Sequence, residues 1–475
     1  MRRSSLTLVG ALLVLGCPDD VTPGSDSTGS TGSTGADTST SGPPITTEGS
    51  GSTTDPTTGL DSSSGPGSQC GNGVVEDDEQ CDDHNTLNDD DCYDDCTIPY
   101  EVLWTQSVHG GGSDYAVRAI FDGAGNLYVT GATDVAGQGS DLWIHQFLPD
   151  GSAGWTYGYD DADVHLDDRG SGLAWHPSGD LLVVGTTETA AGDDILVMRL
   201  GIDDQVPVWI DVYDGPGSGP DPFDDADFGR SVTAAANGDV LVAGSERVDG
   251  QEYDAWLRRY DADGVELWTQ AYDDATVHGT DTGVAVLEDS TGAIYLVGET
   301  ELAPSTYGAL VRKLDGDGTE LWVQTVPDHS PIDARLDGMD DLILAGVSWV
   351  DGDMWIAKYD ADFTEIATTT YDGPSALFDL ARGVAVDASG DVYVGGMISV
   401  VGEQANIWVG RYPPDLQLRW WSDSHGGEAL LGDQANGVAV SDDGTRVAVV
   451  GLETVIGEDT NFWVRVYQNN PTPAR

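Results

Sequence analysis

Four cysteines form the first group of residues that could do chemistry. Cys70, Cys81, Cys92 and Cys96 are separated by ten, ten and three residues. An even set of thiols in an exported chain predicts two disulfides, for which three pairings are open. A structural zinc site is the alternative, but zinc ligands normally come in pairs two to four residues apart. Only Cys92 and Cys96 meet that spacing.

Acidic side chains crowd between these cysteines and form a candidate calcium site. Carboxylate and amide oxygens around a tight turn are ligands that calcium accepts. The candidate ligands are Asp82, Asp83, Asn85, Asp89, Asp90 and Asp91. The alternative is a solvated acidic loop that packs on two disulfides.

A second group of acids recurs along the rest of the chain, each four residues before the aligned start of a short apolar strand. Its members are Asp114, Asp168, Asp227, Asp379 and Asp433. An aspartate at such a position can cap a turn by accepting backbone N–H bonds. It could also line the mouth of a central channel and hold a cation there.

Histidines lie in the loops before the same strands. They are His109, His165, His278, His329 and His425. They could converge on one face as metal ligands, although duplication of a repeat would produce the same pattern.

Motifs for catalysis are missing from the sequence. It contains no GxSxG nucleophile turn, no GKS or GKT phosphate loop and no HExxH zinc-peptidase helix. The turns at 261–264 (DADG) and 315–318 (DGDG) look like calcium loops. A β-hairpin needs Asp and Gly there anyway, and no bidentate Glu follows at the spacing of a calcium-binding helix–loop–helix.

The elements that must position these residues repeat seven times. A glycine closes each copy of one phrase: GNLYVTG, GDLLVVG, GDVLVAG, GAIYLVG, DDLILAG, GDVYVGG and TRVAVVG. A short apolar strand precedes each phrase and an alternating strand follows it. A fourth strand carries Trp104, Trp155, Trp209, Trp268, Trp322 and Trp420, with Ala367 as the exception. Seven units of four short strands predict an all-β, seven-bladed propeller, because only stacked blades bury both faces of each sheet.

The order of the strands predicts how the ring closes. Residues 102–107 form a fourth-type strand with no blade before them, and residues 462–467 form a third-type strand with nothing after them. The N-terminal strand should therefore complete the last blade. The tryptophans should fill the gaps between blades.

Three stretches resemble two kinds of known repeat. Residues 113–131, SDYAVRAIFDGAGNLYVTG, and residues 381–396 are similar to the bacterial SBBP β-propeller repeat. Residues 70–96, with their CGNG opening and Cys-x3-Cys close, resemble the cysteine-rich repeat of myxobacterial surface proteins, although His84 replaces the usual Gly. These resemblances imply fold and extracellular location but no reaction.

The N-terminus predicts export. Arg2 and Arg3 precede an apolar stretch at 6–15, and Val14-Leu15-Gly16-Cys17 resembles the lipobox of bacterial lipoproteins, in which Cys17 would carry lipid. A plain secretory signal is the alternative. We therefore expect a signal peptide at 1–17, a disordered Ser/Thr/Gly-rich linker at 18–69, a cysteine-rich module at 70–98 and a propeller at 101–469.

The net charge of the chain limits the classes of partner that it can bind. The chain has 83 acidic and 19 basic residues and a formal net charge of -64, which excludes nucleic acid as a partner. We expect a surface lipoprotein of the cell envelope or outer membrane, whose propeller is a non-catalytic scaffold for adhesion to a protein or polysaccharide. The alternatives are an exported hydrolase or lyase that uses the acidic loops, with calcium as its cofactor, and a passive envelope component. The repeats are uniform except for a longer loop at 214–228.

Overall fold

The computed structural model describes residues 70–72, 75, 79–82, 84, 92–94, 96–161, 165–217, 226–249, 252–417, 419–427, 429 and 431–470. The expected signal peptide, Cys17 and the linker lie outside these residues. Among the described residues, no helix has the length and apolar character needed to cross a bilayer.

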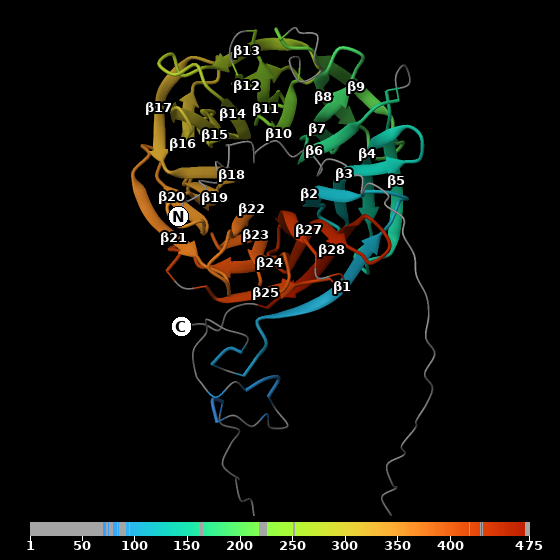
Figure 1. Ribbon diagram of the computed structural model, residues 1–475, viewed down its shortest axis with the longest axis vertical. Helices are drawn as coiled ribbons and strands as arrows, with labels where there is room; N and C mark the ends of the chain where they lie inside the picture. The colour runs from blue at the N-terminus through green and yellow to red at the C-terminus, as the bar shows by residue number, and fades with distance from the viewer. Residues whose placement is uncertain are drawn as a thin grey trace, which may run out of the picture. The chain divides into compact units, whose positions relative to one another are not determined.

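Seven antiparallel sheets of four strands each form the blades of a propeller, arranged around a common axis (Figure 1). Blade 1 contains β2 (Tyr115–Phe121), β3 (Leu127–Val135), β4 (Gly139–Phe147) and β5 (Ala153–Tyr159). Blade 2 contains β6 (Asp168–Trp175), β7 (Leu181–Glu188), β8 (Asp193–Leu200) and β9 (Pro207–Tyr213). Blade 3 contains β10 (Phe228–Ala234), β11 (Val240–Arg247), β12 (Tyr253–Tyr260) and β13 (Glu266–Tyr272).

The remaining blades follow the same order from the inner strand outward. Blade 4 contains β14 (Asp281–Glu288), β15 (Ile294–Ala303), β16 (Thr306–Leu314) and β17 (Glu320–Pro327). Blade 5 contains β18 (His329–Leu336), β19 (Leu342–Ser348), β20 (Met354–Tyr359) and β21 (Glu365–Tyr371). Blade 6 contains β22 (Leu380–Val386), β23 (Val392–Ser399), β24 (Ala405–Tyr412) and β25 (Trp421–His425). Blade 7 contains β26 (Gln434–Val440), β27 (Arg446–Thr454), β28 (Thr460–Asn469) and β1 (Tyr100–Val108).

The predicted closure of the ring is confirmed. The N-terminal strand β1 pairs antiparallel with β28, so the first and last strands of the propeller share blade 7. Both strands extend past the predicted bounds of 102–107 and 462–467, because backbone pairing continues from Tyr100 opposite Asn469 to Val108 opposite Phe462.

The recurring glycine follows from a close approach of two strands. Every inner strand shifts register at one point opposite the second strand of its blade, next to this glycine. A Cβ on Gly131 or Gly298 would overlap the backbone carbonyl oxygen of Tyr115 or Thr282. The same overlap occurs in the other five blades. Glycine therefore permits the bulge that each inner strand carries.

Seven apolar clusters, one between each pair of neighbouring blades, form the core. The tryptophans of the fourth strands contribute to them, as predicted. One member differs: Trp421, not Trp420, pairs opposite Arg411 on β24, the position that Trp209 holds opposite Arg199 in blade 2. Trp421 is buried, and Trp420 packs under the guanidinium of Arg411. A doublet of tryptophans hides this one-residue difference in the sequence.

Candidate functional site: acidic junctions between blades

The cysteine-rich module carries two nested disulfides, Cys70–Cys96 and Cys81–Cys92. This pairing decides among the three that the spacing left open. It also uses all four thiols, so they are not free to act as zinc ligands.

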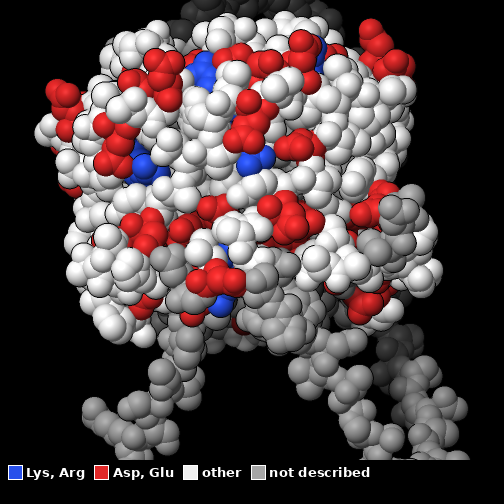
Figure 2. Space-filling model, turned by 90° about the horizontal axis from the view of Figure 1, so that it is seen from above, with Lys and Arg blue, Asp and Glu red and all other residues white. Residues whose placement is uncertain are grey.

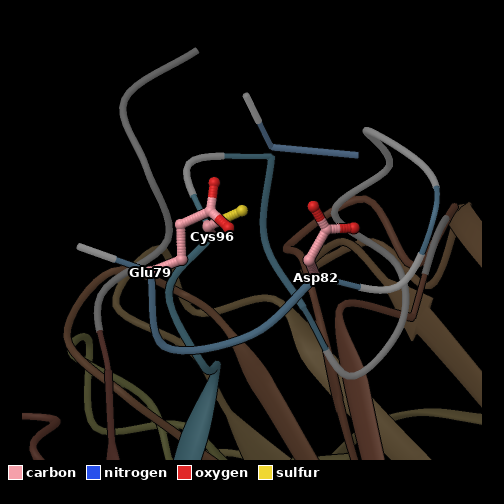
Figure 3. Close-up of side chains that lie close together, drawn as sticks. All are labelled: Glu79, Asp82 and Cys96. Atoms are coloured by element: carbon pink, nitrogen blue, oxygen red, sulfur yellow. The ribbon is translucent and has the colours of Figure 1, made fainter. Parts of the chain in front are cut away.

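Of the calcium ligands predicted in this module, Asp82 alone lies within the described residues. Its carboxylate accepts backbone N–H bonds from Gly71, Asn72 and His84 at 3.0–3.1 Å. Glu79 and Asp82 lie near Cys96 (Figure 3), but the sulfur of Cys96 is bonded to Cys70. Asp83, Asn85, Asp89, Asp90 and Asp91 lie outside the described residues, so a calcium site here stays a prediction.

The five recurring aspartates lie in the connections from the fourth strand of one blade to the inner strand of the next, at or just before the start of that inner strand. All five are buried. Each accepts hydrogen bonds from the loop before its strand, and most also accept them from the second strand. Asp379 accepts N–H bonds from Gly373 at 2.6 Å and from Ser399 at 2.7 Å. Asp227 accepts them from Gly215 and Arg247 at 2.5 and 2.7 Å.

The other three behave alike. Asp433 accepts N–H bonds from Gly427 and Thr454, Asp114 from Gly110 and Asp134, and Asp168 from Asp161. These are the bonds of a capping carboxylate. A sixth aspartate, Asp281, takes the same place in blade 4 and accepts from Asp274 at 2.7 Å. In blade 5 the matching residue is His329, which pairs opposite Ser348 as Asp281 pairs opposite Thr300.

Two further acids join the buried aspartate at four of the seven junctions. One precedes or begins the apolar part of the third strand, and the other directly follows the fourth strand, where the sequence reads Tyr-Asp. Strand register places these two opposite each other, as Leu142 opposite Tyr159 shows for the residues beside them. The four sets are Asp141, Asp160 and Asp168; Asp194, Asp214 and Asp227; Asp254, Asp273 and Asp281; and Asp353, Asp372 and Asp379. We call them the junction clusters.

In two of the junction clusters, the oxygens of all three carboxylates lie close together. One oxygen from each of Asp194, Asp214 and Asp227 lies within 4.8 Å of the others, and the same holds for Asp353, Asp372 and Asp379. Cross-strand like charges normally destabilise a sheet. Three carboxylates at this separation are, however, within reach of one hard cation, whose ligand oxygens surround it at about 2.3–2.6 Å.

The cluster between blades 3 and 4 shows how unfavourable the bare arrangement is. Asp254 is 7% exposed, and its Oδ1 atom is buried and accepts no hydrogen bond from the described residues. Burial, followed by the charges of Asp273, Glu246 and Asp281, raises the pKa of Asp254 to about 7. A buried carboxylate without a partner is expensive. The charge of His278, which bonds to Asp273 at 2.5 Å, offsets part of the shift in the pKa of Asp254.

Aspartates at the neighbouring junctions also have raised pKa values. Burial raises the pKa of Asp227 to about 7 and those of Asp168 and Asp281 to about 6. Burial and then the charge of Asp160 raise the pKa of Asp141. These groups lie at successive junctions around the ring and are not gathered in one pocket.

The histidines stay at separate junctions. His165 and His278 bond to Asp160 and Asp273 at 2.6 and 2.5 Å. His425 bonds to Glu453 at 3.0 Å, and His109 lies 3.7 Å from Asp114. The ring of His329 packs against Trp355 at a tilt of 45°. Each therefore contacts its own junction or blade instead of converging with the others. Residues 218–225, most of the predicted long loop, lie outside the described residues.

The acids of the third and fourth strands are the site residues that sequence reasoning missed. Their signal was present, because Asp-Leu-Trp, Asp-Ala-Trp and Asp-Met-Trp open three third strands and Tyr-Asp ends four fourth strands. Outside these clusters, Asp and Glu are spread over the surface, as the face in Figure 2 shows.

Comparisons with known proteins assign this chain to no family. No family model matches the chain, and no curated protein matches it. Among solved structures, a protein of unknown function from Dyadobacter fermentans is 11% identical and matches over 78% of this chain and 100% of its own, with a TM-score of 0.45. A protein of unknown function from Bacteroides caccae is 10% identical over 62% of this chain and 98% of its own, with a TM-score of 0.38. The periplasmic gluconolactonase of Pseudomonas aeruginosa is 13% identical over 65% of this chain and 84% of its own, with a TM-score of 0.44.

Proposed function

We propose that this chain is an exported, lipid-anchored binding scaffold of the cell envelope, and that calcium ions at its blade junctions make the propeller rigid. The observation that carries the proposal is Asp254, a buried carboxylate whose Oδ1 atom accepts no hydrogen bond from the described residues. The charges of Asp273, Glu246 and Asp281 also act on it. A calcium ion would neutralise such a cluster and join the outer strands of one blade to the inner strand of the next.

Repetition of the cluster favours a scaffold over the alternative of a hydrolase or lyase. Four junctions carry the same three acids, and the carboxylates with raised pKa follow the ring. A catalytic acid works with partners in one cleft. The N-terminal signal and Cys17 support export and anchoring, and the surface acids support a protein or polysaccharide partner over nucleic acid.

Thermal unfolding of the full chain tests the proposal. We expect a higher melting temperature in calcium chloride than in chelator, and little effect of magnesium, which demands a stricter geometry. At a free calcium concentration ten times the Kd, each occupied site adds about 1.4 kcal/mol to the free energy of unfolding.

The variant Asp254→Asn distinguishes a junction cluster that binds a cation from a cluster whose acids are only solvated. In chelator it should raise the melting temperature, because it removes one of three crowded charges. In calcium it should reduce the stabilisation that calcium gives. The control is Asp263→Asn, which makes the same charge change at an exposed turn residue. Equal melting of the wild-type chain with calcium and with chelator would refute the calcium part of the proposal.

A further inference from the structure

Five arginines lie on the innermost strands of the propeller. One of them, Arg169 on β6, pairs with Asp167 and Asp193 near its own strand. The other four are the channel arginines. They are Arg118 on β2, Arg230 on β10, Arg335 on β18 and Arg382 on β22. These strands surround the central axis in Figure 1. In a chain with 83 acidic and 19 basic residues, such a gathering of positive charge needs a reason.

The bulge of the inner strands explains why arginines can point toward the axis. The register shift leaves one extra residue on each inner strand, and that residue is Arg230 in β10 and Arg382 in β22. A bulge re-aims a side chain relative to the regular pleat. In β2, Arg118 is the first paired residue after the shift.

Contacts across the channel bring these side chains together. Asp333 of blade 5 accepts a hydrogen bond from Arg118 of blade 1 at 2.7 Å, although the two blades are not neighbours in the ring. Asp333 also accepts from Arg335 at 2.9 Å and from the backbone of Val384 at 3.0 Å. One buried carboxylate therefore serves two of the four arginines.

Arg382 has no such carboxylate among the described residues. Burial, followed by the positive charges of Arg230 and Arg118, lowers its pKa to about 10. Burial and the charge of Arg169 lower the pKa of Arg230 to the same value. Like charges held together in a partly buried channel repel one another strongly, so an anion placed among them would be stabilised.

A cavity of about 230 Å³ lies beside these guanidinium groups. Arg118, Arg230 and Arg335 line it, together with an apolar wall that includes Ile120, Leu173 and Val286. Its residues come from blades 1 to 5, so it is part of the central channel. It is smaller than the pockets that hold drug-sized ligands, which start at about 300 Å³. The guanidinium fork matches an oxyanion with two parallel N–H bonds.

We propose that the central channel binds a small oxyanion, a carboxylate, phosphate or sulfate group on a short apolar body, between Arg118, Arg230 and Arg335, the three arginines that line this cavity. The proposal names a ligand class for the binding scaffold proposed above and rests on that function. It does not depend on calcium at the junctions, because the junction clusters are made of aspartates and the channel site is made of arginines.

Isothermal titration calorimetry on the full chain tests the inference. The probes are sodium sulfate, methyl phosphate and sodium butanoate, each at constant ionic strength against sodium chloride and in calcium chloride buffer. We expect saturable binding of at least one probe with one site per chain. The preferred probe identifies which of the three groups the channel accepts.

Two variants make the test specific. Arg230→Gln should weaken binding at least tenfold while it raises the melting temperature, because it removes a repelled charge that lines the cavity. Arg199→Gln is the control, since Arg199, on the third strand of blade 2, bonds to Asp180 and to the backbone of Ala262 in a turn of blade 3. It changes the net charge equally and should leave binding unchanged.

Three outcomes would overturn the inference: no saturable binding of any probe by a folded chain, unchanged binding in Arg230→Gln, or an equal loss in Arg199→Gln. If calcium still raises the melting temperature in that case, the channel site alone is refuted and the calcium-fastened scaffold stands. If calcium has no effect on the melting temperature while an anion binds, calcium at the junctions is refuted and the channel site stands.

Discussion

The blade junctions and the central channel use the same inner strands in opposite ways. On β22 and the loop before it, Asp379 enters a junction cluster and Arg382 enters the channel. Asp227 and Arg230 repeat this arrangement at β10. Both regions hold like charges together, negative at the junctions and positive in the channel. The net charge of a chain therefore does not predict the sign of its buried sites.

The two regions also differ in how their charges are compensated. At the junctions, backbone N–H groups bond to both carboxylate oxygens of Asp379, whereas Asp168, Asp254 and Asp281 each keep one buried oxygen without a hydrogen bond from the described residues. In the channel, a single carboxylate, Asp333, bonds to two arginines from different blades. Three substitutions test this difference between the two regions.

The largest effect is expected from Asp333→Asn. Removing one partner of a buried ion pair costs about 3–5 kcal/mol, and Asp333 is 1% exposed. Chemical denaturation should show this loss, and sodium sulfate should restore part of it by returning negative charge to the channel. An unchanged denaturation midpoint would show that the channel arginines do not need this carboxylate.

The second change concerns pH and Asp254. The pKa of Asp254 is raised in the folded chain to about 7, against about 3.9 when unfolded. The folded state then binds this proton more tightly, so the stability contributed by the group falls as the pH rises from about 4 to about 7.

Asparagine at position 254 does not titrate. In chelator, the free energy of unfolding of Asp254→Asn minus that of wild type should therefore rise by at most about 1.4 kcal/mol per pH unit in that window. Below about pH 4 this difference should no longer depend on pH. Denaturation at a series of pH values measures the difference, with Asp263→Asn as the flat control. The same difference at every pH would contradict the raised pKa.

The smallest effect is expected from Asp379→Asn. The asparagine has one acceptor oxygen for the N–H groups of Gly373 and Ser399, so one buried donor loses its bond. Such a loss costs about 1–3 kcal/mol. The melting temperature should therefore fall in chelator, whereas Asp254→Asn raises it. A rise in both variants would mean that the inner-strand aspartates repel more than they cap.

Local patterns were enough to predict the fold. The seven phrases, the position of each glycine and the order of strand types predicted seven blades and the closing strand, because each depends on contacts within a blade or along the chain. Glycine recurs because a Cβ would overlap a carbonyl oxygen of the adjacent strand. That constraint repeats at a fixed place in every copy.

The candidate sites were predicted less completely because they depend on contacts between blades. The sequence identified Asp168, Asp227 and Asp379 but not the acids that meet them, nor Asp281. Which residues meet across a junction follows from how neighbouring sheets pack. The approach of Arg118 to Asp333 spans non-neighbouring blades, so no local pattern contains it.

The closing strand has a consequence for the order in which the chain folds. Strand β1 is synthesised first but finds its partner only when β28 has been made. Until then β1 has no sheet to join, and β28 presents an open edge to other chains. Contacts between distant parts of a chain also form slowly. The ring must therefore close late, and a chain that loses its last strand would leave both ends exposed to aggregation.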